Sequence, residues 1–587
     1  MKEIFIEDTR NVEQCHIGGK VPRRPPRPDP ERISAPACDR ARHDGRAGPA
    51  MPARTTVPIM PITPALTTLT TARHAHHPPE APPMPHRTRV PRSPDLDRLA
   101  ATVLQPGFDG TTPPDWLRAQ LAGGLGGVVL FARNISPGTA GLVRSLRAEN
   151  PEVIVAVDEE GGMVTRLEAA SGSSWPGNAA LGLLDDPDRT ERTGAEIGRM
   201  LAAEGITLNY APDVDVNADP ANPVIGVRSF GADPALVARH AAAWVAGHQS
   251  AGVAACAKHF PGHGDTVTDS HLALPAVHAA RDLLERRDLP PFRAAIAAGV
   301  RAIMCGHLLV PALDPDLPAT LSPRVLTGLL REELGFEGLL VTDAIEMRAV
   351  AARLPQPEIA VRALAAGADA VCVGASSPGG ENVVALREAI VRAVHEGALA
   401  ESRLAEAAGR VRALAAWHEA ARATGEAPPV PRDPAYGVSR LGLETARLAL
   451  RVTAGAERVE RPVLTRPPRV IEMTARPHLA AGGAPPYGPA EALAALLPGT
   501  TRETLTPERH DLPALDDPGR APLVVVTRDA HRHAWMRDGL RRIVRRRPDA
   551  IVMEMGLPGS PAGALYLATS GDSRVTALAA AEWLTSR

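Results

Sequence analysis

The chain has 587 residues and a formal net charge of −2 at pH 7. This length exceeds what one hydrophobic core usually serves, so we expect more than one folded domain. The balanced charge gives no overall basic field and does not favour a nucleic acid or an acidic membrane surface as partner. No segment reaches the roughly 18 apolar residues of a membrane span, and none resembles a convincing signal peptide, which favours a cytoplasmic location.

Residues 1–92 are rich in proline, arginine and histidine and lack apolar periodicity. Such a composition cannot bury enough apolar surface to offset the entropy lost on ordering, so it predicts a disordered tail. The cluster of His74, His76 and His77 offers metal ligands, but low-complexity composition is the favoured interpretation. An internal start at a methionine within this tail would leave export open.

From residue 95 onward, short apolar runs alternate with segments long enough for helices. The runs are VLQPGFDG, GGVVLFARN, VIVAVDEEGG, ITLNYAPDVDV, GVAACAKHF, RAIMCGHL, GLLVTDAIEM and DAVCVG. Eight such runs without short hairpin turns between them predict an α/β fold, a parallel TIM-type (β/α)8 barrel, in residues 93–425. The chemistry of such barrels lies at the carboxyl ends of the strands. The polar residues at these ends are Asp158, Asp215, Lys258, His259, His307 and Asp343.

A proline-rich linker, residues 426–439, follows the barrel region, and residues 440–587 are expected to form a second domain. This region begins with a helical pattern, ETARLALRVTA, and contains three strand candidates, RVIEMTA, PLVVVTRDA and AIVMEMGLP. The pattern predicts a smaller α/β domain, in which we find no catalytic constellation. The basic run LRRIVRRRPD is interpreted as a solvated helix face.

The five cysteines have no spacing typical of a disulfide framework. They are Cys15, Cys38, Cys256, Cys305 and Cys372. The last three lie inside apolar, strand-like runs, so we expect buried free thiols there.

The densest polar segment is KHFPGHGDTVTDSHLALP, residues 258–275, whose glycines and prolines predict a loop. His259 and His263 are four residues apart, which would suit a metal on a helix, but a loop does not hold them on one face. Asp269 and His271 are two residues apart and would point the same way in an extended segment. A carboxylate placed in this way orients the imidazole and supports its charged form, so the pair indicates acid/base chemistry, although a structural Asp–His pair is also common.

This loop closely resembles the characteristic motif of bacterial β-N-acetylglucosaminidases of glycoside hydrolase family 3. Five further segments resemble the same family in the same order and extend the resemblance over residues 157–374. They are VDEEGGMVTRL, APDVDVN, VIGVRSFGADP, PATLSPRVLTGLLREELGFEGLLVTDAIEM and LAAGADAVCVG. Six ordered motifs are far more specific than one, although the tail and the C-terminal region carry none of them.

The resemblance implies a retaining exo-β-N-acetylglucosaminidase that works without a metal or cofactor. Asp343 would be the nucleophile, and Asp269 and His271 would form the acid/base dyad. The residues implied to bind the terminal sugar are Asp158, Arg166, Arg228, Lys258 and His259. The implied partner is a small carbohydrate, an N-acetylglucosaminyl saccharide or a muropeptide, in peptidoglycan turnover and recycling. The oligomeric state stays open.

Two positions depart from the family pattern: Met163 stands where many relatives have arginine, and Ala344 stands where many have a second aspartate. The main alternative is a phosphorylase, in which phosphate instead of water releases the sugar from Asp343. A non-catalytic sugar-binding protein and a metallohydrolase are weaker alternatives. A β-glucosidase is disfavoured, because that branch typically takes its acid from the second domain and lacks the Asp-Ser-His loop.

Overall fold

The computed structural model describes residues 94–423, 428–454, 464–475, 479–482, 487–512, 515 and 521–586. The predicted tail lies outside these described residues, and so do its histidine cluster and the first two cysteines. The other three, Cys256, Cys305 and Cys372, are buried free thiols, as predicted. No helix of the described residues is long and apolar enough to cross a bilayer. The cytoplasmic location stays a prediction.

Parallel strands form the predicted barrel. They are β1 Leu104–Pro106, β2 Gly127–Leu130, β3 Ile154–Val157, β4 Leu208–Asn209, β5 Ala254–Phe260, β6 Ala302–Cys305, β7 Leu339–Thr342 and β8 Val371–Val373. Strands β2 to β7 form one sheet in chain order, and β1 pairs with β8. Isolated parallel bridges, Gly107 to Val129 and Val341 to Ala370, join the two sheets. Each of the eight apolar runs therefore supplies one strand.

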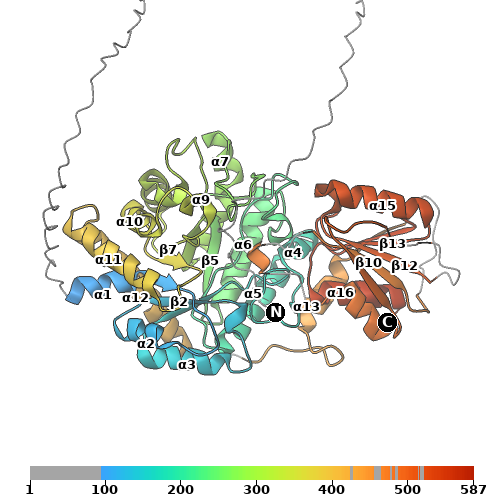
Figure 1. Ribbon diagram of the computed structural model, residues 1–587, viewed down its shortest axis with the longest axis horizontal. Coiled ribbons are helices and arrows are strands. Elements are labelled where there is room, and N and C mark those ends of the chain that lie inside the picture. Colours follow the sequence, from blue (N-terminus) through green and yellow to red (C-terminus); the bar gives the residue numbers. More distant parts are fainter. Residues whose placement is uncertain are drawn as a thin grey trace, which may run out of the picture. The chain divides into compact units, whose positions relative to one another are not determined.

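Helices surround these strands, and Figure 1 shows α2, α3, α10 and α11 outside the strands. The α-helices are α1 Pro94–Thr102, α2 Asp115–Ala122, α3 Thr139–Glu149, α4 Asn178–Leu184, α5 Pro187–Ala203, α6 Pro234–Gln249, α7 Arg281–Arg287, α8 Leu289–Ala297, α9 Arg348–Ala351, α10 Gln356–Ala366, α11 Glu381–His395 and α12 Glu401–Arg422. The 3-10 turns are η1 Ala132–Asn134, η2 Gly226–Arg228 and η3 Ala319–Leu321, and η4 Arg324–Glu333 is a π-type helix. Asp186 and Asp233 cap the first backbone N–H groups of α5 and α6, and each is followed by a proline that suits the first helical position.

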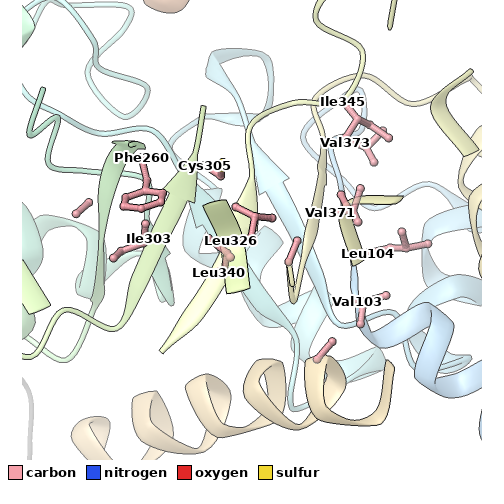
Figure 2. Close-up of a cluster of buried hydrophobic side chains, with 14 of the residues drawn as sticks. Val103, Leu104, Phe260, Ile303, Cys305, Leu326, Leu340, Ile345, Val371 and Val373 are labelled. Atoms are coloured by element: carbon pink, nitrogen blue, oxygen red, sulfur yellow. The ribbon is translucent and has the colours of Figure 1, made fainter. Parts of the chain in front are cut away.

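Alternating strand residues divide the barrel core into two layers. Ala302, Leu339 and Val341 belong to the inner layer, which the helix α12 completes with Val411 and Leu414. The intervening residues face the surrounding helices. Figure 2 shows part of this outer layer, including Ile303, Leu340 and Val371 from neighbouring strands.

The C-terminal region forms a second sheet, in the order β11-β10-β12-β13-β14-β9. Its strands are β9 Arg451–Ala454, β10 Arg469–Met473, β11 Thr501–Leu505, β12 Leu523–Thr527, β13 Ile551–Glu554 and β14 Leu565–Ala568. Only β9 is antiparallel to its neighbour. The helices are α13 Arg440–Ala449, α14 Pro489–Leu496, α15 Ala534–Arg546 and α16 Arg574–Thr585, with the short turns η5 Leu479–Ala481 and η6 Ala530–Arg532.

This sheet lies between two helical layers, which confirms a smaller α/β fold. Val470 and Val524 contact a cluster that includes α14 and α16, whereas Ile471 and Val525 pack in the cluster that contains α15 residues. All three predicted strands are present. The predicted helix through residue 454 is wrong at its end, because α13 stops at Ala449 and the β-branched residues that follow pair as the edge strand β9.

Candidate active site

Strand alternation directs three charged side chains into the carboxyl end of the barrel, called the barrel mouth below. In β7, Leu339 and Val341 belong to the inner core, so Asp343 is the next residue with inward parity. The same two-residue step along β3 and β5 gives Asp158 and Lys258. The mouth therefore holds two carboxylates and an amine, as the sequence predicts for a barrel of this type.

The charged residues of the mouth pair with one another. The Lys258 amine lies 2.8 Å from the nearest Asp158 oxygen and 2.7 Å from Glu160 Oε1. The Arg228 guanidinium donates from Nη2 and Nε to the two Glu160 oxygens, at 2.7 and 2.9 Å. Arg166 Nη2 lies 3.8 Å from Asp158. Buried charges are costly unless they pair, and the predicted pairing of the binding residues is present.

Glu160 is the centre of this network and was not predicted. Burial would raise the pKa of its carboxyl, but Arg228 and Lys258 outweigh burial and hold the pKa well below its usual range. The pKa of Lys258 is raised, because Asp158 and Glu160 outweigh burial there. Both groups therefore stay charged at neutral pH. The spacing of two residues between Asp158 and Glu160 suggests the same side of the strand end, but does not indicate the partners Arg228 and Lys258.

Asp343 follows β7 and is held as a carboxylate. Its Oδ1 accepts a hydrogen bond of 2.8 Å from the Ala344 backbone N–H. Burial opposes ionisation, but the neighbouring imidazoles of His307, His259 and His271 and the Ala344 N–H outweigh it, so the pKa of Asp343 is lowered. An ionised carboxylate at a strand end can attack an electrophilic carbon.

Asp269 and His271 are in contact, as their spacing predicts. His271 Nδ1 lies 2.7 Å from Asp269 Oδ1, and the His271 backbone N–H donates to the same oxygen at 2.9 Å. The extended backbone that we expected is wrong: the Leu272 N–H donates to the Asp269 carbonyl, so the segment turns at this point. An aspartate that bonds the backbone two residues on stabilises such a turn. The turn holds His271 Nδ1 against Asp269, so the other ring nitrogen, Nε2, is the one that could exchange a proton with a ligand.

His259 and His263 share one buried carboxylate, Asp215. Asp215 Oδ2 lies 2.7 Å from His259 Nδ1, and Asp215 Oδ1 accepts from the His263 backbone N–H at 2.6 Å. Burial, with Arg228 as the next cause, lowers the pKa of His259 to about 4, so its ring is neutral at pH 7. Asp215 therefore fixes the orientation of a neutral His259 ring in the mouth.

Asp213, Asp215 and His259 place three potential metal-ligand atoms within 4.8 Å of one another. The Arg228 guanidinium is 3.5 Å from Asp213 Oδ2, and His259 already bonds Asp215. A fixed guanidinium at this distance repels a second cation, so the residues fit an internal charge network better than a metal site. Burial, with Asp215 as the second cause, raises the pKa of Asp213 to about 7.

His263 supports the loop instead of facing the mouth. No helix spans residues 259–263, so the HxxxH spacing does not form the helical metal motif. Its Nδ1 lies 2.8 Å from Thr266 Oγ1, and its Nε2 lies 3.2 Å from Ser270 Oγ. His307 similarly bonds Thr320 Oγ1 and the Ala344 carbonyl, at 2.8 and 3.0 Å. Both histidines therefore have internal partners on both ring nitrogens.

The second domain reaches the rim of the mouth at Arg166. The Arg166 guanidinium donates to the Ala480 and Ala481 carbonyls of η5, at 2.7 and 3.4 Å. On the barrel side, Glu159 Oε2 accepts from the Arg166 N–H at 2.8 Å, and burial raises the pKa of this carboxyl to about 7. Neither contact was predicted. Met163, which departs from the family pattern, borders a small pocket with Glu160 and Arg228.

The fold and mouth define a class: a parallel β/α barrel whose mouth holds an ionised carboxylate, a histidine–carboxylate pair and a network of buried charges suited to a polar ligand. Residues 114–414 match the model of the glycosyl hydrolase family 3 N-terminal domain. The chain is 39% identical over 257 residues to a β-hexosaminidase of Alkalilimnicola ehrlichii, and the match covers 42% of this chain and 73% of that protein. The chain therefore belongs to glycosyl hydrolase family 3 and is a glycoside hydrolase.

Other proteins that are similar to the chain support this membership of the family. The chain is 36% identical over 283 residues to β-hexosaminidase A of Pseudoalteromonas piscicida, and the match covers 44% of this chain and 47% of that protein. A family 3 β-N-acetylglucosaminidase from Paenibacillus sp. str. FPU-7 has a similar structure, with a TM-score of 0.74 and 33% identity over 84% of this chain and 96% of that one. A β-glucoside phosphorylase, at 20% identity and a TM-score of 0.67, shares the fold.

Proposed function

We propose that the protein is a retaining exo-β-N-acetylglucosaminidase with Asp343 as nucleophile and the Asp269–His271 dyad as acid/base. The observation that carries the proposal is the contact of 2.7 Å between His271 Nδ1 and Asp269 Oδ1. His271 is also one of the imidazoles that lower the pKa of Asp343. The names of the related proteins, β-hexosaminidase and β-N-acetylglucosaminidase, support the substrate class.

In the first step, the Asp343 carboxylate attacks the anomeric carbon while His271 donates its Nε2 proton to the departing oxygen. Asp269 holds Nδ1 and stabilises the imidazolium before the proton leaves. The product is a covalent glycosyl ester on Asp343. In the second step, neutral His271 takes a proton from water, the water oxygen bonds the anomeric carbon and Asp343 departs, so that the configuration is retained.

The charge network of the mouth fits a terminal sugar. We assign sugar binding to the five residues that the resemblance implies, Asp158, Arg166, Arg228, Lys258 and His259. Asp158 can accept hydrogen bonds from ring hydroxyls, while the cationic groups donate to sugar oxygens. Lys258 pairs with Asp158, and Glu160 and Asp215 hold Arg228 and His259. These contacts keep the side chains ordered before the sugar arrives, which lowers the entropy cost of binding.

We assign the substrate to N-acetylglucosaminyl saccharides, including muropeptides, and the role to peptidoglycan turnover. Phosphorolysis is the competing reaction at the same nucleophile. A histidine acid adds no negative charge beside Asp343 once it has lost its proton, so an anionic phosphate would be repelled less than by a carboxylate pair.

The test uses aryl β-N-acetylglucosaminide and aryl β-glucoside, each with and without phosphate, and identifies the released sugar. We expect free N-acetylglucosamine at a rate that does not depend on phosphate. Phosphate-dependent formation of the sugar 1-phosphate would establish phosphorolysis instead. Glucose release alone would contradict the substrate class, and tight sugar binding without release would point to a binding protein. Retention of configuration at the anomeric carbon is checked by identifying which anomer of the released sugar forms first.

A further inference from the structure

The second domain contacts the barrel at a loop that lies outside the proposed chemistry. Arg532, in η6 after β12, donates a hydrogen bond to the Asn222 carbonyl, and its guanidinium also bonds Asp529 at 2.8 Å. The adjacent His531 ring nitrogen lies 2.9 Å from the Pro220 carbonyl. These contacts fix the barrel loop 219–222 from the side of the second domain.

Asn222 connects this loop to the segment that carries the dyad. The residue is 1% exposed, and its side-chain Nδ2 donates to the His263 carbonyl at 2.9 Å. Its Oδ1 accepts from the backbone N–H groups of Val224 and Ile225, at 2.8 and 2.9 Å. The amide of Asn222 is therefore fully oriented, and a shift of the loop would be passed to His263.

His263 in turn contacts the dyad segment itself. Its Nε2 lies 3.2 Å from the hydroxyl of Ser270, which stands between Asp269 and His271. His263 and Ser270 are 1% and 2% exposed, so neither group has water as an alternative partner. A buried polar group that loses its partner destabilises the fold, so both side chains favour this one arrangement.

We propose that Arg532 is a positioning residue for the acid/base dyad and acts through Asn222, His263 and Ser270. The second domain thereby sets the position of the proton donor without touching the substrate there. This inference rests on the proposed roles of Asp269 and His271. It assigns the second domain a part in catalysis, although that domain supplies no acid of its own in this proposal.

The nucleophile does not share this chain of contacts. Asp343 is held by the Ala344 N–H, and its own backbone N–H donates to the Cys305 carbonyl at 3.0 Å. Loss of the Arg532 contact should therefore displace the proton donor and leave the nucleophile in place. A substrate whose leaving group needs protonation will be affected, and an activated aryl glycoside will be affected little.

The experiment measures kcat/KM for Arg532→Ala on an N-acetylglucosamine disaccharide and on a dinitrophenyl glycoside. We expect a loss of about 10-fold on the disaccharide and less than about 2-fold on the activated substrate, because a misplaced group loses only part of general-acid catalysis. Arg532→Lys, which keeps a cationic donor, should recover part of the loss. The matched control is Arg541→Ala, at an exposed arginine on α15 that pairs with Asp538.

Two further variants make the result decisive. Ser270→Ala removes the His263 contact from within the barrel, so it should reproduce the leaving-group selectivity even if Arg532→Ala does not fold. His271→Ala sets the limit expected for complete loss of the acid. Equal losses on both substrates for Arg532→Ala and Ser270→Ala, beside a selective loss for His271→Ala, would overturn the positioning role alone. A non-selective loss for His271→Ala would overturn the proposed acid and this inference with it.

Discussion

Asp343 is fixed by backbone contacts, whereas the dyad stands on a turn that side chains support. Replacement of Asp343 by asparagine keeps the size of the side chain and removes the nucleophilic charge. We expect kcat on an aryl β-N-acetylglucosaminide to fall about 10³-fold or more, with little change in melting temperature. The control is Asp282→Asn on α7, whose side chain is largely exposed beside Arg286. Activity of Asp343→Asn close to that of the control would exclude the assigned role.

Glu160 gives a pH-dependent prediction at the same scale. Its pKa in the folded protein lies below that of an unfolded glutamate, about 4.3, because Arg228 and Lys258 outweigh burial. Ionised Glu160 therefore contributes stability above about pH 4.3, and the contribution is lost as the pH falls toward the folded pKa. Glu160→Gln should lower the free energy of unfolding by about 3 kcal/mol at pH 7, because Arg228 and Lys258 both lose a buried carboxylate partner.

The check is a comparison of melting temperatures of wild type and Glu160→Gln between pH 7 and pH 3. The two values should converge toward the acidic end, as the wild type loses the charge that the variant lacks throughout. A difference that grows on acidification would show that the sign assigned to this carboxyl is wrong.

Spacing predicted the contacts between near neighbours but missed distant partners. Asp269 and His271 were brought together correctly because two residues leave the side chains few options, although the backbone turns where we expected an extended segment. Glu160 was missed because its partners, Arg228 and Lys258, are 68 and 98 residues away in sequence. Ion pairs of that kind depend on the closed barrel, which spacing alone does not describe.

At the scale of elements, α5 and α6 approach closely because glycines lie between them. A Cβ on Gly247 of α6 would lie 1.9 Å from the Glu191 carbonyl oxygen, and one on Gly194 of α5 would lie 2.6 Å from the Trp244 carbonyl oxygen. Both neighbours are helix backbone and cannot yield without separation of the helices. These glycines therefore set the distance between the two helices.

We expect Gly247→Ala to lower the free energy of unfolding by about 2 kcal/mol, a typical cost of overpacking. Gly409→Ala is the matched control, because a Cβ at Gly409 in α12 meets nothing within 4 Å. Alanine there should raise stability by about 0.5–1 kcal/mol, since it favours the helix. Thermal unfolding of both variants checks the pair, and equal shifts would contradict a steric cause.

Strands and helices with a clear apolar sequence pattern were predictable, whereas those with a weak or ambiguous pattern were not. Each barrel run ends in polar or glycine-containing residues, so the eight strands could be located even where the strand is short, as in β4. The α13–β9 boundary failed because ETARLALRVTA keeps helical apolar spacing to its end, while pairing with β14 decides the state of its last residues. The edge strand β11 was also missed, because it is stabilised by pairing with its neighbour β10 and not by a pattern of its own.

At the scale of the whole described chain, contacts between the barrel and the second domain begin at the linker. Ser439 Oγ donates to Glu196 Oε2 at 2.5 Å, and Arg432 pairs with Glu168 at 3.2 Å. In α13, a Cβ on Gly442 would lie 1.9 Å from the Ser174 carbonyl oxygen. The first helix of the second domain therefore lies directly against barrel backbone.

Gly442→Ala should force this helix away from the barrel. We expect faster tryptic cleavage at Arg432 and a lower melting temperature, because the linker loses the packing that protects it. Leu448→Ala on the same helix is the control, since Leu448 is 53% exposed. If cleavage at Arg432 is as slow in Gly442→Ala as in the control, the close approach does not hold the linker.

Lysine usage has a practical consequence for experiments on this protein. The lysines are Lys2, Lys20 and Lys258, and the Lys258 side chain is only 3% exposed and paired with two carboxylates. Residues 94–586 therefore offer no accessible lysine amine among those the structure describes. An amine-directed dye or resin should therefore leave Lys258 in the barrel mouth unmodified.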